Sequence, residues 1–190
     1  MRNTIKVVYF ALALVLGFST AACSGSGGSG DSVKNAKELK IYLDSQPANT
    51  SDEPIKVAMD TKKLTQSIAE TISASGKYVS LDLSGSVLKT IPEDAFKRCK
   101  GLVNITIPDS VKSIGQGAFS DCTILKSVTI GNGVKSIGVN AFFECTSLTN
   151  VTIPNSVTSI GDLAFNGCKG LTSVTIPDKR KMTHFTQLQG

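Results

Sequence analysis

The sequence has no tryptophan and a single histidine among its 190 residues. That histidine, His184, lies close to the C-terminus and belongs to no Ser-His-Asp or Cys-His arrangement. Paired carboxylates and acidic loops with calcium-binding spacing are also missing. The sequence therefore predicts a protein that is not an enzyme and has no catalytic residue, no metal ligand and no cofactor.

Charge of either sign is also modest. The chain has 20 lysines and arginines against 15 aspartates and glutamates, and its formal net charge is +5. No arginine-rich segment or set of aromatic side chains is present on which nucleic-acid bases would stack. We therefore expect no nucleic-acid partner.

The longest apolar run is too short to cross a membrane as a helix. It extends from Val7 to Phe18, whereas a spanning helix needs about 20 residues. Basic residues precede it and small residues follow it, which is typical of a secretory signal peptide over residues 1–22. The small residues before Cys23 resemble a bacterial lipobox, which implies that Cys23 becomes a lipidated N-terminus and anchors the chain in the membrane. Cleavage near Ala22 without lipidation is the alternative.

A Gly/Ser-rich tether follows Cys23, so that residues 23–31 form the lipidated cysteine and a flexible linker. Gly25, Gly27 and Gly30 satisfy the G-x-G-x-x-G pattern of dinucleotide sites. That pattern works only between a strand and a helix, so we do not expect phosphate binding here.

Residues 32–77 have the spacing of a small α/β unit. Apolar residues at helical spacing predict one helix capped by Ser32 and a second capped by Asp60 and ending near Gly76. An alternating strand from Ile55 lies between them. Because a solenoid needs a distinct first unit to cover its apolar end, we interpret this region as an N-terminal cap.

From residue 78 the sequence repeats with a period of 23 residues, which is the signature of a solenoid. Each copy contains a Val-x-Ile strand, a Pro or Gly break, Ser-Ile-Gly and then Ala-Phe-x-x-Cys. We call equivalent residues of successive copies a column. The phenylalanine and cysteine columns are expected to form the stacking core: Phe96, Phe119, Phe142, Phe165, Cys99, Cys122, Cys145 and Cys168.

The Val-x-Ile-Pro, Ser-Ile-Gly and Ala-Phe-x-x-Cys blocks together resemble the BspA-type leucine-rich repeat of bacterial surface proteins. The resemblance covers residues 78–177. It implies a leucine-rich-repeat solenoid of α/β type, with one short parallel strand per coil and short helical or 3₁₀ turns opposite. It also implies a location at the bacterial cell surface and partners among host extracellular or other surface proteins.

The cysteine column allows three interpretations. Strands about 4.8 Å apart would permit disulfides between coils, but identical side chains in a stack point in parallel. No histidine or acidic column accompanies the thiols to complete a metal site. We therefore favour buried free thiols that pack as small hydrophobic groups.

Two polar columns are expected to point outward from the predicted sheet and to form a flat strip. Such faces often bind proteins in solenoids. The strip consists of Asn104, Thr106, Ser127, Thr129, Asn150, Thr152, Ser173 and Thr175. The alternative is that threonine occurs there only for its strand propensity. Val139, Phe143 and Leu163 replace polar or small residues of other copies and form a second, apolar candidate.

Residues 178–190 no longer follow the repeat. Met182, Phe185 and Leu188 would cover the last coil, or the last strand would remain an open edge and favour self-association. The leading hypothesis is a surface lipoprotein that binds host or neighbouring-cell proteins through its solenoid. The alternative is a structural, self-associating envelope lipoprotein without a host ligand.

Overall fold

The computed structural model describes residues 32–175, and the side chains are described up to Thr172. From Val33 onward the cap and the repeats form one compact unit and share one hydrophobic core. Within the described residues, no helix is long and apolar enough to cross a membrane.

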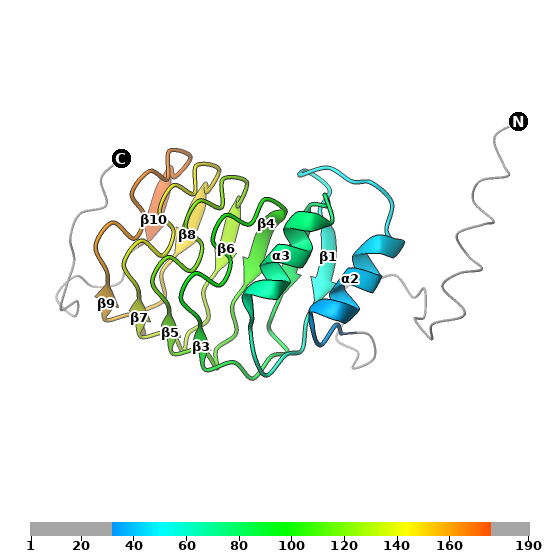
Figure 1. Cartoon of the computed structure of the whole chain (residues 1–190). Coiled ribbons are helices and arrows are strands. Elements are labelled where there is room, and N and C mark those ends of the chain that lie inside the picture. Colours follow the sequence, from blue (N-terminus) through cyan, green and yellow to red (C-terminus); the bar gives the residue numbers. More distant parts are fainter. Residues whose placement is uncertain (1–31, 176–190) are drawn as a thin grey trace, which may run out of the picture. The chain divides into compact units, whose positions relative to one another are not determined.

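The larger of two sheets is parallel and runs the length of the solenoid (Figure 1). Its six strands, in spatial order, are β1 (Ile55–Ala58), β2 (Val79–Asp82), β4 (Leu102–Thr106), β6 (Ser127–Thr129), β8 (Asn150–Thr152) and β10 (Ser173–Thr175). Successive strands come from successive coils, because about 23 residues bring the chain back to the same place. The leucine-rich-repeat solenoid is thus confirmed, with about five coils.

A second, narrower parallel sheet lies along another side of the coils. It consists of β3 (Thr90–Ile91), β5 (Ser113–Ile114), β7 (Ser136–Ile137) and β9 (Ser159–Ile160). In each strand the isoleucine is buried. The Ser-Ile-Gly block, which is replaced by Thr90-Ile91-Pro92 in the first coil, therefore supplies one inward side chain and one backbone link to the next coil.

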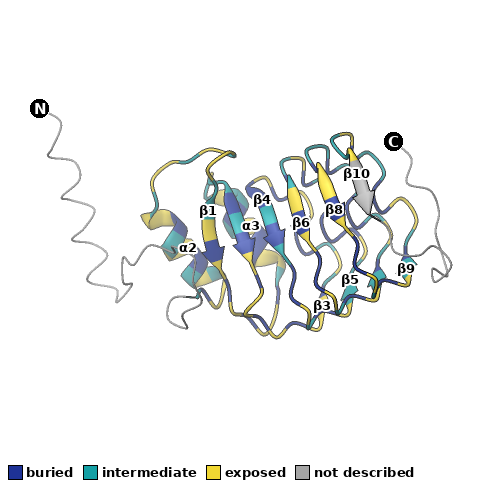
Figure 2. Cartoon of the chain, turned by 180° about the vertical axis from the view of Figure 1, so that it is seen from behind, coloured by how far each residue is buried: buried dark blue, intermediate teal, exposed yellow. Residues whose placement is uncertain are grey.

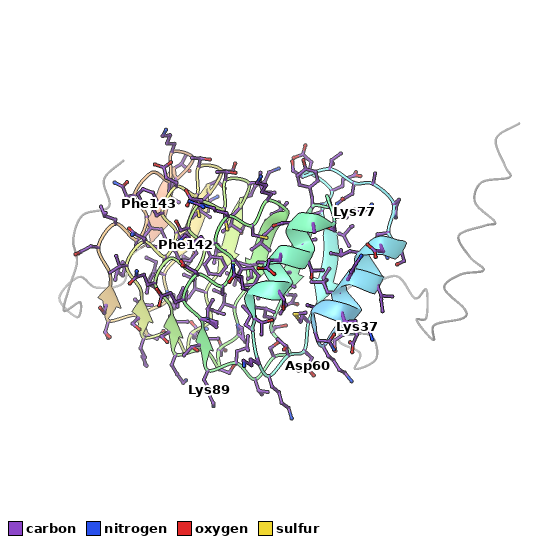
Figure 3. The ribbon with its side chains drawn as sticks, in the orientation of Figure 1. Lys37, Asp60, Lys77, Lys89, Phe142 and Phe143 are labelled. Atoms are coloured by element: carbon purple, nitrogen blue, oxygen red, sulfur yellow. The ribbon has the colours of Figure 1, made fainter. Side chains whose placement is uncertain are left out.

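The phenylalanine column forms a continuous stack inside the coils. The ring centroids of Phe96 and Phe119 are 5.3 Å apart, and the next two pairs are each 5.1 Å apart. The rings are nearly parallel, with angles of 3°, 2° and 10° between successive planes. Figure 3 shows Phe142 among the inner side chains of the coils. The stack follows directly from the repeat, because equivalent side chains are separated by one strand spacing of about 4.8 Å.

The Ala-Phe-x-x-Cys segments form successive turns rather than the helical or 3₁₀ turns expected from the sequence. Two positions in each coil have positive φ, which interrupts a helix. They are Asp94 and Arg98, Gly117 and Asp121, Asn140 and Glu144, and Leu163 and Gly167. The backbone donors freed by this geometry bond to the next coil. Phe96 N–H, for example, donates to the Ala118 carbonyl at 2.8 Å.

Replacing Arg98 by glycine is expected to raise the free energy of unfolding by about 1 kcal/mol, because the left-handed conformation costs a side-chain-bearing residue about 1–2 kcal/mol. Arg98 has φ 58°, and Gly167 occupies the equivalent position in a later coil. The ion pair that would be lost, with Asp121, is long at 3.8 Å and exposed, and so it is worth little. Chemical denaturation measures the change.

The matched control is Lys97→Gly at the preceding position, where φ is not positive. There glycine adds conformational freedom to the unfolded chain and removes the exposed ion pair between Lys97 and Asp94 at 3.1 Å, so stability should fall by about 0.5–1.5 kcal/mol. If Arg98→Gly and Lys97→Gly changed the free energy of unfolding by the same amount, the backbone strain proposed at Arg98 would be contradicted.

The cap contains two helices, α2 (Ala36–Ser45) and α3 (Gln66–Ala74), but the residues predicted to cap them were wrong. Asn35, not Ser32, caps α2, and its side chain accepts a hydrogen bond from Glu38 N–H at 3.0 Å. Thr65, not Asp60, precedes α3. Asp60 instead follows β1 at the coil corner, where its N–H donates to the Val33 carbonyl. The cap thus adds one strand, β1, to the solenoid sheet.

At the other end, β10 pairs with β8, and no further strand follows it among the described residues. The predicted capping residues of the tail, Met182, Phe185 and Leu188, lie outside the described residues, as does Cys23 at the predicted lipidation site.

Candidate interaction surface

The register of the larger sheet places the residues of the predicted polar strip in two rows. We call the side of the sheet that carries them the strand face. Asn104, Ser127, Asn150 and Ser173 are paired in sequence across four strands. A second row lies two residues further along each strand and consists of Thr106, Thr129, Thr152 and Thr175. Figure 2 shows exposed and buried residues alternating along β6 and β8.

The strip is most open at its centre. Ser127, Thr129, Asn150 and Thr152 are exposed, whereas Asn104 and Thr106 are half-buried. Ser173 and Thr175 continue the two rows by their backbone register, and their side chains lie outside the described set. The exposed side chains on β6 and β8 are short and uncharged, so this part of the face is flat and polar.

Sequence comparison of the repeats missed the N-terminal part of this face. Ser80 pairs with Asn104, and Asp82 pairs with Thr106, while Lys56 of β1 pairs with Ser80. The face therefore extends over all six strands, and at its N-terminal end it carries the charged side chains of Lys56 and Asp82. The early coils depart from the 23-residue template, and for that reason the repeat pattern alone did not reveal these three residues.

An open groove of about 480 Å³ borders the strip at the carboxyl ends of β2, β4 and β6. Residues 84–87, 106–110 and 129–132 line it, so it shares Thr106 and Thr129 with the strip. Val87 on its wall is 59% exposed and gives the groove an aliphatic side chain. The groove was not predicted, because its shape depends on how three separate coil corners stack.

A loop of the cap reaches over the opposite border of the strip. Lys126 Nζ lies 2.6 Å from Asp52 Oδ1 and 3.2 Å from the Ser51 carbonyl oxygen. Asn49 fixes the loop by accepting from Tyr78 N–H at 3.1 Å and donating to the Tyr78 carbonyl at 2.7 Å. The hydrogen bond from Lys126 and its positive charge lower the pKa of the Asp52 carboxyl from its ordinary value. The loop thus links the cap to the beginning of β6.

The cysteine column is buried, and its four thiols are free. The Cys122 thiol donates to the Phe96 carbonyl of the preceding coil at 2.9 Å, and Cys145 and Cys168 repeat this bond at 3.1 Å. Burial raises the pKa of Cys122 far above its ordinary value, which keeps this thiol protonated and able to donate. Within residues 32–175, no group of three or more His, Cys, Asp or Glu side chains is placed to hold a metal ion.

The apolar candidate residues are spread over two coils near the C-terminal end. Val139 is 39% exposed and Leu163 is 49% exposed, whereas Phe143 is half-buried. Leu163 also has φ 56°, a conformation that disfavours a branched side chain. Figure 3 labels Phe143 in the upper part of the coils, beside the inner Phe142.

The geometry defines a parallel β-solenoid with 23-residue coils and a polar strand face. The family model described as BspA type leucine rich repeat region matches residues 68–187, with six copies. Because this match covers well over half of the sequence, the chain belongs to the BspA-type leucine-rich-repeat family. The matched region begins inside the predicted cap and extends into the predicted tail. Repeats of this family generally serve as non-catalytic scaffolds for protein interaction, typically at bacterial surfaces.

Three solved structures are similar to the chain. A leucine-rich repeat protein from Bacteroides capillosus is 36% identical, over 46% of this chain and 62% of that one, with a TM-score of 0.43. The T. pallidum leucine rich repeat protein is 25% identical, over 69% and 67%, with a TM-score of 0.42. A leucine rich cell surface protein from Faecalibacterium prausnitzii is 22% identical, over 80% and 45%, with a TM-score of 0.47.

The chain therefore spans 62% of the length of the Bacteroides capillosus structure. Comparison with curated proteins gives no match.

Proposed function

We propose that the chain is a non-enzymatic bacterial cell-surface lipoprotein whose strand face binds host extracellular proteins or proteins of neighbouring cell surfaces. The observation that carries the proposal is the strip of short, exposed polar side chains in register across β6 and β8. Buried isoleucines, phenylalanines and cysteines fill the coil interior, so the strip is not needed to form the core.

Membership of the BspA-type family supports a role in protein interaction at the cell surface. Lipid attachment at Cys23 belongs to the same proposal and is supported by the basic start, the apolar run and the small residues that precede this cysteine. An acyl anchor followed by a short Gly/Ser-rich tether would hold the solenoid close to the membrane surface.

The proposal is tested by capturing surface proteins on the chain and by measuring how substitutions in the strip change their affinity. The purified chain is immobilised, extracellular matrix and cell-surface proteins are passed over it, and the affinity of each retained protein is measured. Replacing Asn150 and Thr152 by arginine places two bulky charges on the exposed part of the face. Affinity should fall at least about tenfold, because an unpaired charge in an interface costs several kcal/mol.

The matched control is Gln116→Arg with Thr123→Arg, which adds the same charge at exposed positions outside the larger sheet. The control should bind like the unmodified chain. Equal loss in both double variants would remove the strand face from the proposal. Failure to retain any surface protein, together with dimers in light scattering, would favour the self-associating envelope protein, for which the edge strand β10 is the supporting feature.

A further inference from the structure

Three lysines form a column on a different side of the solenoid from the strand face. Lys89, Lys112 and Lys135 immediately precede β3, β5 and β7, and all three are exposed. Their backbones are linked in sequence: Lys112 N–H donates to the Lys89 carbonyl, and Lys135 N–H donates to the Lys112 carbonyl, each at 2.8 Å. The three side chains therefore leave the coils about 4.8 Å apart at the backbone. Figure 3 labels Lys89 on the lower edge, near β3.

The fold does not require lysine at this position. Thr158 occupies the equivalent place in the next coil, and its N–H donates to the Lys135 carbonyl at the same 2.8 Å. Identical charges stacked in register on adjacent strands repel one another and are unfavourable for stability. A column of three lysines therefore adds charge repulsion that a threonine column would avoid.

The charges of this column are not neutralised within the described part of the chain. The ion pairs among residues 32–172 involve Lys40, Lys97, Arg98 and Lys126, and none involves the three column lysines. Asp109 precedes Lys112 by three residues; its carboxylate accepts the Asn132 N–H at 2.6 Å and forms no ion pair with a column lysine. Glu93, beyond β3, is exposed and forms no ion pair with the column.

A column of hydroxyl groups lies directly beside the lysines. Thr90, Ser113 and Ser136 each follow a column lysine, in the strand position that alternates with the buried isoleucine. The edge therefore presents ammonium groups and hydroxyl groups in parallel rows. The large exposed hydrophobic residues of the described chain, which are Ile41, Val87, Val139 and Leu163, belong to neither row.

We propose that this edge, which we call the lysine edge (Lys89, Lys112 and Lys135), binds a linear anionic polysaccharide that lies along the stacking direction of the coils. Sulfates or carboxylates on the sugars would pair with the ammonium groups, and sugar hydroxyls would bond to the adjacent serines and threonine. An acidic peptide fits less well. Alternate side chains on one face of an extended strand are about 6.6 Å apart, which does not match the coil spacing of about 4.8 Å.

Binding of dextran sulfate to the full chain, measured by calorimetry at two salt concentrations, tests the proposal. The double variant Lys112→Gln with Lys135→Gln should bind about fivefold more weakly for each lysine removed, and its affinity should depend less on salt. The matched control is Lys100→Gln with Lys169→Gln, which removes two exposed, unpaired lysines from another side of the coils. This control should retain the affinity of the unmodified chain.

A variant that is expected to bind more tightly provides a further test, because loss of folding can weaken binding but cannot strengthen it. Thr158→Lys extends the lysine edge to a fourth coil, and it should tighten dextran sulfate binding about fivefold. Neutral dextran should not bind. Equal weakening in the control double variant, no gain from Thr158→Lys, or tighter binding to poly-glutamate or phosphatidylglycerol vesicles than to dextran sulfate would each overturn the proposal.

Discussion

Replacing Phe142 by alanine is expected to lower the free energy of unfolding by about 3–5 kcal/mol. The Phe142 ring is fully buried and lies 5.1 Å from the rings of both Phe119 and Phe165. The substitution therefore leaves a cavity and also removes two stacking contacts, each worth about 0.5–1.5 kcal/mol beyond the area that they bury. Urea denaturation followed by circular dichroism measures the loss.

The neighbouring residue supplies the control. Phe143 has the same side chain but is only half-buried, and its ring belongs to no stacked pair of the column. Phe143→Ala should cost less than half as much as Phe142→Ala. Equal losses would mean that the phenylalanine column is not the main source of coil-to-coil stability.

Replacing Gly138 by alanine is the second substitution with a large expected effect. A Cβ atom at Gly138 would lie 2.7 Å from both Gln116 N and the Gly115 carbonyl carbon of the preceding coil. These are backbone atoms, so the two coils must separate to accept the methyl group. Overpacking of this kind costs about 1–3 kcal/mol, which denaturation would detect as a lower midpoint.

Gly85 is the matched control for Gly138. A Cβ atom there would meet nothing closer than the Asp60 Cβ at 3.9 Å, and Gly85 does not have positive φ. Gly85→Ala should therefore stabilise the chain by about 0.4–1 kcal/mol, because it restricts the unfolded state. A loss at Gly85 as large as that at Gly138 would contradict the role given to the Ser-Ile-Gly column.

The interior of the coils could be predicted from the sequence because a fixed period places equivalent residues one above another. Phe96 and Cys99 needed no structure to be placed next to Phe119 and Cys122. The period also predicted the register of Asn150 with Ser127, since the strands from β4 to β10 pair without a shift. These features depend only on the repeat length and on the alternation of side chains along a strand.

Features that depend on one particular place in the chain were harder to predict. Asn35 and Glu38 have the spacing of a capping pair, but Ser32 looked equally suitable from composition alone. Asp60 looked like a helix cap, although the chain uses it at the corner of the first coil. The link between Asp52 and Lys126 joins residues 74 positions apart, and nothing in the repeat pattern signals it.

The conformation of the turns at Phe96, Phe119 and Phe142 was also not predicted correctly from the sequence. Ala-Phe-x-x-Cys resembles a short helical segment in composition. Its N–H groups instead bond to the next coil, and this requires positive φ at residues such as Arg98 and Glu144, which do not favour it. Bonds between coils therefore outweigh the local preferences of these residues.

The backbone bonds between coils have a consequence for the length of the protein. Phe96, Phe119 and Phe142 each donate to the alanine carbonyl one coil further on, always at 2.8 Å. One junction is therefore interchangeable with the next, and a unit of 23 residues can be removed or duplicated without a new kind of contact. Duplicating or removing a coil that carries a column lysine would change the length of the strand face and of the lysine edge together, in steps of about 4.8 Å. Insertion or deletion of whole repeats can therefore change the length of the solenoid while the sequence and the contacts of each coil stay the same.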